Sequence, residues 1–277
     1  MERLFEYSEE NLPLYIFEEI SRIPRESGNE TEIRDFLIQR AQDKGFEAIY
    51  DEANNVIIKK PGSKGYEDYP PIILQAHMDM VCEKLITSEH DFRYDPIELV
   101  VDGDMIRAEG TTLGADDGIG VALGMSVLES DDFSHPPLEL LFTAEEETSF
   151  HGAESINGKL FKGHRVINLD FSEDDKIVVG SCGGVGMKVK LLVQKERIVR
   201  ENGKAWEISI TGMPGGHSGE DVNKGYGSAI QLMTRVLRQL LRQFDIGLVS
   251  LKGGSNRLAL ARECKAVVLT YADLLPT

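Results

Sequence analysis

Cysteine is scarce in this chain, and its three cysteines, Cys82, Cys182 and Cys264, lie far apart. The absence of a CxxC pair argues against a zinc ribbon and a disulfide framework, and it favours a reducing, cytoplasmic location. Long apolar runs are also missing, since no stretch approaches the roughly 18 apolar residues that a membrane span needs. The acidic N-terminal segment lacks the basic and apolar regions of a secretory signal. We therefore expect a cytoplasmic protein with no membrane partner.

Basic residues are outnumbered: 30 lysines and arginines stand against 47 aspartates and glutamates, giving a formal net charge of −17 over 277 residues. Nucleic acid needs a basic footprint, so we expect no nucleic-acid partner. Solubility is one explanation of the acidic excess, and a cluster of carboxylates neutralised by metal is another. Both can hold, because a metal site would use only a handful of the acidic residues.

Apolar periodicity predicts helices and strands that alternate along the first part of the chain. The expected helices cover residues 12–23, 29–44 and 119–128, and the expected strands cover residues 46–50, 55–60, 72–76, 97–101, 105–108, 138–143 and 166–169. This alternation is typical of an α/β fold, a mixed or parallel sheet with helices on both faces. In such sheets functional sites gather at the carboxyl ends of the strands.

The pattern changes near residue 185. Strands are expected over residues 185–193, 206–211, 246–252 and 264–271, and a long amphipathic helix over residues 228–243. We therefore expect a first domain over residues 1–184 and a second, α+β domain over residues 185–277. No helix follows the last strand, so we expect the second domain to be incomplete.

The most informative segment, ILQAHMDM, places His77 and Asp79 at the end of an apolar strand. Side chains alternate along a strand, so both residues point to one face. A metal-binding imidazole usually donates its second ring N–H to a carboxylate, which fixes its tautomer. By itself His77 could equally be a core histidine with satisfied hydrogen bonds.

Three acidic clusters strengthen the metal interpretation. They are Asp116-Asp117 in a glycine-rich turn, Glu145-Glu146-Glu147 after the strand over residues 138–143, and Asp170 after the next strand. Each has a simpler explanation: Asp117 as a helix cap, the glutamates as an acidic helix start, Asp170 as a strand end. One imidazole with several convergent carboxylates is, however, a ligand set for hard or borderline divalent metals.

Adjacent glutamates can divide two tasks, because one can bind metal while its neighbour acts as a general base. Later in the chain, the glycine-rich run GMPGGHSG presents His217. That run is either a tight turn with an exposed histidine or a site that offers the histidine to a substrate oxyanion.

The ordered motifs HMD, LGADDGIG, EEETSFHGA, INLD and GGHSGEDVNKG resemble the M20 family of dinuclear zinc metallopeptidases. The resemblance runs from about Ile20 to about Glu263. It is strongest to the aminoacyl-histidine (Xaa-His) dipeptidase branch, because Gly118 stands where the tripeptidase branch typically carries a lysine.

The resemblance implies a zinc-peptidase-like catalytic domain with a lid domain, and a role for each motif residue. The implied metal ligands are His77, Asp116 as the bridge between two metals, Glu147 and Asp170. The implied catalytic residues are Asp79, which orients His77, and Glu146, the general base. His217 resembles the lid histidine that binds substrate. A cis peptide between Asp116 and Asp117 is also implied.

Members of the family return to the catalytic domain after the lid and supply a last histidine ligand, but here no histidine follows His217. We therefore expect an N-terminal part of a longer enzyme, with one well-liganded metal position at most and weak or no peptidase activity.

For an intact enzyme the resemblance implies metal-dependent hydrolysis of short peptides, dipeptides of the Xaa-His type, with two Zn²⁺ ions. Mn²⁺ and Co²⁺ fit the same ligands. It also implies a homodimer formed through the lid domain. Two alternatives stay open: a deacylase or carboxypeptidase that acts on N-acyl amino acids, and a truncated, non-catalytic binding remnant.

Overall fold

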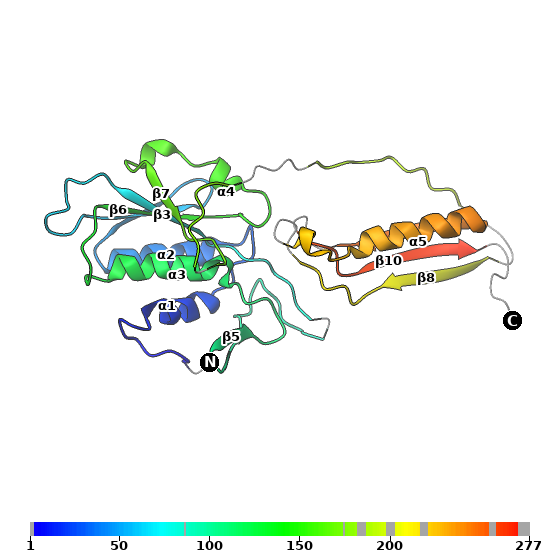
Figure 1. Cartoon of the computed structure of the whole chain (residues 1–277), viewed down its shortest axis with the longest axis horizontal. Coiled ribbons are helices and arrows are strands. Elements are labelled where there is room, and N and C mark those ends of the chain that lie inside the picture. The colour runs from blue at the N-terminus through cyan, green and yellow to red at the C-terminus, as the bar shows by residue number, and fades with distance from the viewer. Residues whose placement is uncertain are drawn as a thin grey trace. The chain divides into compact units, whose positions relative to one another are not determined.

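The structure, a computed structural model, describes residues 3–85, 87–173, 175–181, 187–197, 203–216, 221–254 and 259–270 (Figure 1). Its contacts divide the chain into two compact units, Met1–Ile177 and Val178–Thr277. Each unit is described by itself. The domain boundary that the sequence predicts, between residues 184 and 185, lies outside the described residues and stays a prediction.

A five-stranded mixed sheet forms the centre of the first unit, with the strand order β1-β2-β6-β3-β7. The strands are β1 (Glu47–Tyr50), β2 (Val56–Lys60), β3 (Ile72–His77), β6 (Leu138–Thr143) and β7 (Arg165–Asn168). β3 runs parallel to both β6 and β7, whereas β2 is antiparallel to β1 and β6. The carboxyl ends of β3, β6 and β7 therefore lie at one edge of the sheet.

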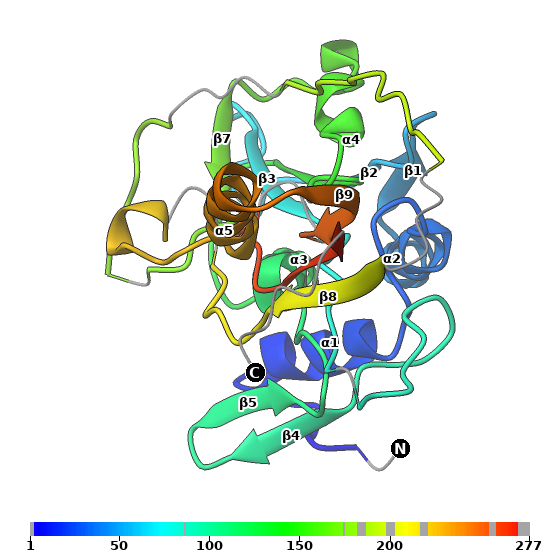
Figure 2. The same ribbon diagram turned by 90° about the vertical axis from the view of Figure 1, so that its right-hand side faces the viewer.

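Helices cover both faces of this sheet, as predicted. On one face lie α2 (Thr31–Asp43) and α3 (Ala115–Glu129), and α1 (Leu12–Ser21) packs against α3 (Figure 1). On the other face lie the short α4 (His151–Glu154) and a 3₁₀ turn, η1 (Gly158–Leu160). The hairpin of β4 (Leu99–Asp102) and β5 (Met105–Ala108) lies beside α1 (Figure 2). The predicted α/β class of this unit is confirmed.

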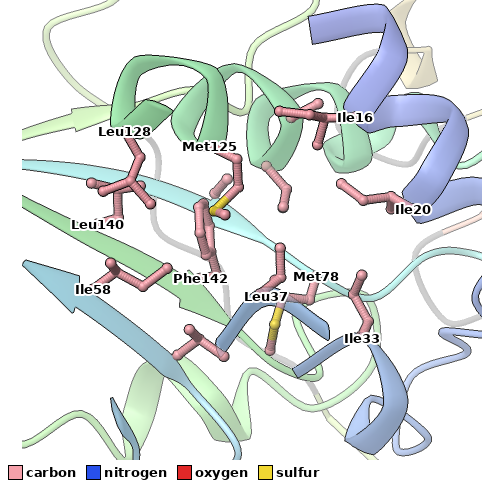
Figure 3. Close-up of a cluster of buried hydrophobic side chains, with 14 of the residues drawn as sticks. Ile16, Ile20, Ile33, Leu37, Ile58, Met78, Met125, Leu128, Leu140 and Phe142 are labelled. Carbon is pink, nitrogen blue, oxygen red and sulfur yellow. The ribbon is translucent and has the colours of Figure 1, made fainter. Parts of the chain in front are cut away.

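The main core lies between the sheet and the three long helices (Figure 3). It is built from the apolar faces that the helical and strand periodicities predict. Among its fully buried side chains are Ile16, Ile20, Ile33, Leu37, Ile58, Met78, Met125, Leu128, Leu140 and Phe142. Within the described part of the chain, no helix has the length and apolar composition needed to cross a bilayer.

The second unit is an antiparallel sheet of order β8-β10-β9, covered on one face by α5. The elements are β8 (Lys204–Ile210), η2 (Val222–Lys224), α5 (Ala229–Gln243), β9 (Ile246–Gly253) and β10 (Cys264–Thr270). Met233 and Leu237 of α5 are buried with Cys264, Ala266 and Val268 of β10. The α+β class predicted for this unit is confirmed.

The strand predicted over residues 185–193 is wrong for its described part, because residues 187–193 form no strand. Their apolar side chains are exposed, and Leu192 is fully so. Alternation of apolar and polar residues makes a segment able to form a strand, but a ladder also needs a neighbouring strand to exchange hydrogen bonds. The sheet described for this unit provides none for this segment.

Candidate metal centre

The sheet register brings the predicted ligands to one edge. His77 is the last residue of β3 and lies opposite Thr143, the last residue of β6. Glu146 and Glu147 follow β6 closely, and Asp170 follows β7. Because these three strands are parallel neighbours, the residues that follow them meet at a common edge, where α3 also begins, with Asp116 in its first turn.

The imidazole of His77 lies at the centre of this group. Its Nε2 lies 3.0 Å from Asp116 Oδ1, 3.9 Å from Asp170 Oδ2 and 4.0 Å from Glu146 Oε2. The His77 side chain is 1% exposed, whereas that of Asp116 is 73% exposed. A buried imidazole therefore faces a set of carboxylates that solvent can reach.

Asp79 connects the imidazole to the acidic loop. One oxygen lies 3.3 Å from His77 Nδ1 and accepts a hydrogen bond from the backbone N–H of Glu146. The other accepts from the backbone N–H of Glu147 and from Ser27 Oγ. The carboxylate is fully buried, so it is placed to orient the imidazole and the two glutamates together.

Asp117 acts as a cap and a tether. It accepts from the backbone N–H of Gly120, three residues on, as helix caps do, and also from the backbone N–H of His77. The peptide between Asp116 and Asp117 is cis, so that prediction is confirmed. Asp117 thereby fixes the end of β3 to the start of α3.

A buried amide holds the loop that carries the glutamates. Asn55 donates to the carbonyl of Gly152 and accepts from the backbone N–H of Ala144, so it fastens both ends of the loop. Gly152 is tightly enclosed: a Cβ there would lie 2.2 Å from the Ala144 carbonyl oxygen.

Burial and mutual repulsion shift the ionisation of the acidic groups. Burial raises the pKa of Glu147 to about 7, and the negative charges of Asp116 and Glu146 act in the same direction. Burial also raises the pKa of Asp117 to about 7, with repulsion from Asp170 adding to it. The pKa of Glu146 is raised in the same way, mainly by burial. Crowded carboxylates of this kind favour a bound cation.

His77 compensates some of this negative charge. Burial lowers the pKa of the imidazole, but its hydrogen bonds with Asp116 and Asp79 raise the pKa more strongly, to about 11. A divalent cation held by His77 and these carboxylates would replace the proton of the imidazolium.

Two groups of donor atoms have the spacing of a metal site. In His77, Asp116 and Asp170, and again in His77, Glu146 and Glu147, the donor atoms lie within 4.8 Å of one another. One imidazole nitrogen with carboxylate oxygens suits zinc, manganese or cobalt. The residues present therefore fit a divalent metal, and they could hold more than one.

Comparison with known proteins places the chain in a family. No family model matches it. It is 37% identical over 262 residues to the cytosol non-specific dipeptidase of Escherichia coli, an alignment that covers 94% of this chain and 54% of that protein. It is also similar to the crystal structure of aminoacylhistidine dipeptidase from Vibrio alginolyticus, with 32% identity, a TM-score of 0.59, and coverage of 96% of this chain and 55% of that one. The chain belongs to the M20 peptidase family.

A similar fold is also found at lower sequence identity. A tripeptidase structure from Staphylococcus aureus matches with 21% identity and a TM-score of 0.53, covering 96% of this chain and 67% of that one. The present chain spans about half the length of the curated dipeptidase that it matches.

Within this M20 chain, the structure brings most of the predicted site residues together. His77, Asp79, Asp116, Glu146, Glu147 and Asp170 lie at one sheet edge, whereas His217 lies outside the described residues. Sequence reasoning missed the residues that hold this group in place, Arg25, Ser27, Glu30 and Asn55. Their local patterns resemble those of ordinary loop residues, and only the fold shows what they contact.

Proposed function

We propose that this M20 chain carries the metal centre of a metal-dependent dipeptidase. The observation that supports this most is the convergence of His77 with four carboxylates, from Asp116, Glu146, Glu147 and Asp170, at the carboxyl ends of three parallel strands. Two relatives named as dipeptidases, from Escherichia coli and Vibrio alginolyticus, each align with nearly the whole chain.

The proposed ligands divide into two overlapping sets. His77 and Asp170 would hold one metal, Glu147 would hold the other, and Asp116 would be shared by both. When bound, such metals polarise a peptide carbonyl and acidify water. Among the described residues, the second position has carboxylates but no imidazole of its own, so we expect it to bind metal more weakly and hydrolysis to be slow.

Glu146 is the proposed general base. It takes the proton of the attacking water and delivers it to the leaving amine, and its raised pKa suits a group that must both accept and release a proton. Asp79 keeps the tautomer and direction of the His77 ring. In this proposal His217 of the second unit supports the oxyanion, from the other subunit of a homodimer.

The proposed substrates are dipeptides in the cytoplasm, and Zn²⁺ is the proposed metal. The names of the two relatives suggest two substrate specificities: hydrolysis of many dipeptides, and a preference for Xaa-His dipeptides. We propose Xaa-His dipeptides as the first to be tested, with Mn²⁺ and Co²⁺ as substitute metals.

The experiment combines metal titration with hydrolysis. Calorimetry with Zn²⁺ should detect one tight site, and the metal-loaded chain should cleave β-Ala-His above background. Glu146→Gln should keep the metal affinity and lower the rate by roughly 100-fold or more, the range for loss of a general base. Absence of Zn²⁺ binding at micromolar concentrations would refute the proposal. Faster cleavage of N-acetyl amino acids than of dipeptides would favour a deacylase.

A further inference from the structure

Arg25, in the short segment between α1 and α2, is the largest of the fully buried side chains in the described structure and is only 2% exposed. Burying a guanidinium is costly unless its donors find partners. The partners of Arg25 are distinctive, because they are backbone carbonyls of the loops that carry the candidate ligands.

The guanidinium joins two of these loops. Nη1 donates to the carbonyls of Met78 and Asp79, at 3.0 and 3.1 Å. Nη2 donates to the carbonyl of Gly114, just before Asp116. One side chain therefore ties the backbone that leaves β3 after His77 to the turn that presents Asp116.

Two glycines of the motif LGADDGIG make room for this guanidinium. A Cβ on Gly114 would lie 2.5 Å from Arg25 Nη2, and a Cβ on Gly118 would lie 2.6 Å from the same atom. Gly114 also has a φ of +70°, which disfavours other residues. The glycines on either side of Asp116 and Asp117 are therefore explained by close contact with Arg25.

Neighbours of Arg25 reach the third loop. Ser27 Oγ donates to Asp79 at 2.7 Å, and Glu30 accepts from the backbone N–H of Glu145 at 3.0 Å. The segment from Arg25 to Glu30 thus contacts three loops of the site: the one after β3, the turn that presents Asp116, and the one after β6 that carries Glu146 and Glu147.

Arg25 is charged, but its hydrogen bonds in the described structure do not pair that charge with a carboxylate. Burial lowers the pKa of the guanidinium to about 10, with the carboxylates of Asp79, Asp117 and Asp116 opposing that shift, so it stays charged at neutral pH. Its described hydrogen bonds nevertheless go to carbonyl oxygens and to no carboxylate. The contacts are those of a backbone clamp.

We propose that Arg25 is a positioning residue of the metal centre, whose guanidinium sets the separation of His77 and Asp116 at which both bind one cation. This inference rests on the proposed function, because it requires that these residues bind metal. A planar group with donors on two nitrogens can join carbonyls from two loops, whereas an ammonium is a compact charge.

The test compares Arg25→Met and Arg25→Lys with a control, Arg40→Met. Arg40 is also largely buried, but its hydrogen bonds go to Glu19 and Glu129, which are not candidate ligands. Two quantities are measured on the 277-residue chain: the Zn²⁺ affinity by calorimetry, and the visible absorption spectrum of bound Co²⁺, which reports ligand geometry.

Arg25→Met should weaken Zn²⁺ binding by about 10- to 100-fold, the range for loss of a residue that supports metal ligands, and should alter the Co²⁺ spectrum. Arg25→Lys should lie between Arg25→Met and wild type. Arg40→Met should leave the Zn²⁺ affinity and the Co²⁺ spectrum unchanged, even if its melting temperature falls as much as that of Arg25→Met.

Wild-type affinity and spectrum in Arg25→Met would overturn the inference while the proposed function stands. An equal loss in Arg40→Met would also overturn it, since the effect would then be general destabilisation. If Arg25→Met does not fold, Arg25→Lys decides, and folded Arg25→Lys with wild-type binding counts against the proposal. Failure of the wild-type chain to bind either metal would overturn the proposed function, and this inference with it.

Discussion

The Asp79 carboxylate is fully buried, and both of its oxygens accept hydrogen bonds from the backbone. Few other side chains could replace it at this position. Burial raises the pKa of its carboxyl, but the hydrogen bond and charge of His77 lower that pKa more, so the group is ionised. An acceptor-only group is required here, since the surrounding groups are donors.

Replacing Asp79 with asparagine should therefore damage the site without removing a metal ligand. The amide NH₂ would face a donor, either the backbone N–H of Glu147 or that of Glu146. We expect about 1–3 kcal/mol less stability and about 10- to 100-fold weaker Zn²⁺ binding. Urea denaturation and calorimetry measure the two effects. Asp102→Asn, at an exposed position on β4, is the control, and wild-type metal affinity in Asp79→Asn would contradict the assigned role.

Metal binding should depend on pH, because the ligands hold protons when metal is absent. Glu147, with a pKa raised to about 7, and His77, with a pKa raised to about 11, must both lose a proton to bind a cation. We expect Zn²⁺ affinity at pH 6 to be at least about tenfold lower than at pH 8. Calorimetry in two buffers of different ionisation enthalpy counts the protons released, and equal affinities at both pH values would refute the prediction.

The same pKa shifts determine whether the stability of the metal-free chain rises or falls with pH. Folding raises the pKa of Glu147 from 4.5 and of His77 from 6.5, so the folded state binds more protons than the unfolded state. That contribution to stability is complete below the unfolded pKa of each group and is lost as pH rises towards the folded pKa. The melting temperature of the metal-free chain should fall between pH 5 and pH 8.

At the residue scale, the sequence indicated the candidate metal ligands, but it did not indicate the residues that hold them in place. Histidine and clustered acids at strand ends are visible as types and spacings, so His77, Glu146 and Asp170 could be named. Arg25 and Asn55 could not, because their partners are backbone groups of segments distant in the chain. Only the folded contacts reveal such partners.

At the scale of elements, periodicity predicted the strands and the three long helices of the first unit to within a few residues, but not the short α4 or η1. The order of the strands is set by tertiary packing, and β6 inserts between β2 and β3. The segment over residues 187–193 shows the limit, because alternating residues gave it strand character but not a neighbour with which to pair.

The loop between β6 and α4 depends on one buried side chain from the start of β2. Asn55→Ala would leave the buried N–H of Ala144 without its acceptor, at a cost of about 1–3 kcal/mol. It would also free the loop from the carbonyl of Gly152. Because Glu146 and Glu147 lie on this loop, we expect weaker Zn²⁺ binding as well as a lower free energy of unfolding.

Lys60→Met is the matched control for Asn55→Ala. The Lys60 ammonium is also buried and donates to the carbonyls of Val127 and Ser130 at the end of α3, where no candidate ligand lies. It should lower stability and leave Zn²⁺ affinity unchanged. If the two variants lose metal affinity equally, the loop has no special dependence on Asn55.

At the scale of the whole molecule, the two units have separate cores. The main core and the candidate ligands lie within Met1–Ile177, while a second apolar cluster lies within Val178–Thr277. A unit with its own core can fold alone in principle. The change of pattern in the sequence predicts a boundary near residue 185, whereas the contacts divide the chain after Ile177.

A fragment of residues 1–177 should therefore fold cooperatively and bind Zn²⁺ within about threefold of the affinity of the 277-residue chain. The physical reason is that His77, Asp116, Glu147 and Asp170 are positioned by elements of this unit alone. Calorimetry and thermal unfolding with and without Zn²⁺ measure binding and folding together. His77→Ala in the same fragment is the control and should abolish both binding and the metal-dependent rise in melting temperature. A folded fragment that binds no metal would show that the second unit contributes to the centre, and the assignment of the ligands to one unit would then be wrong.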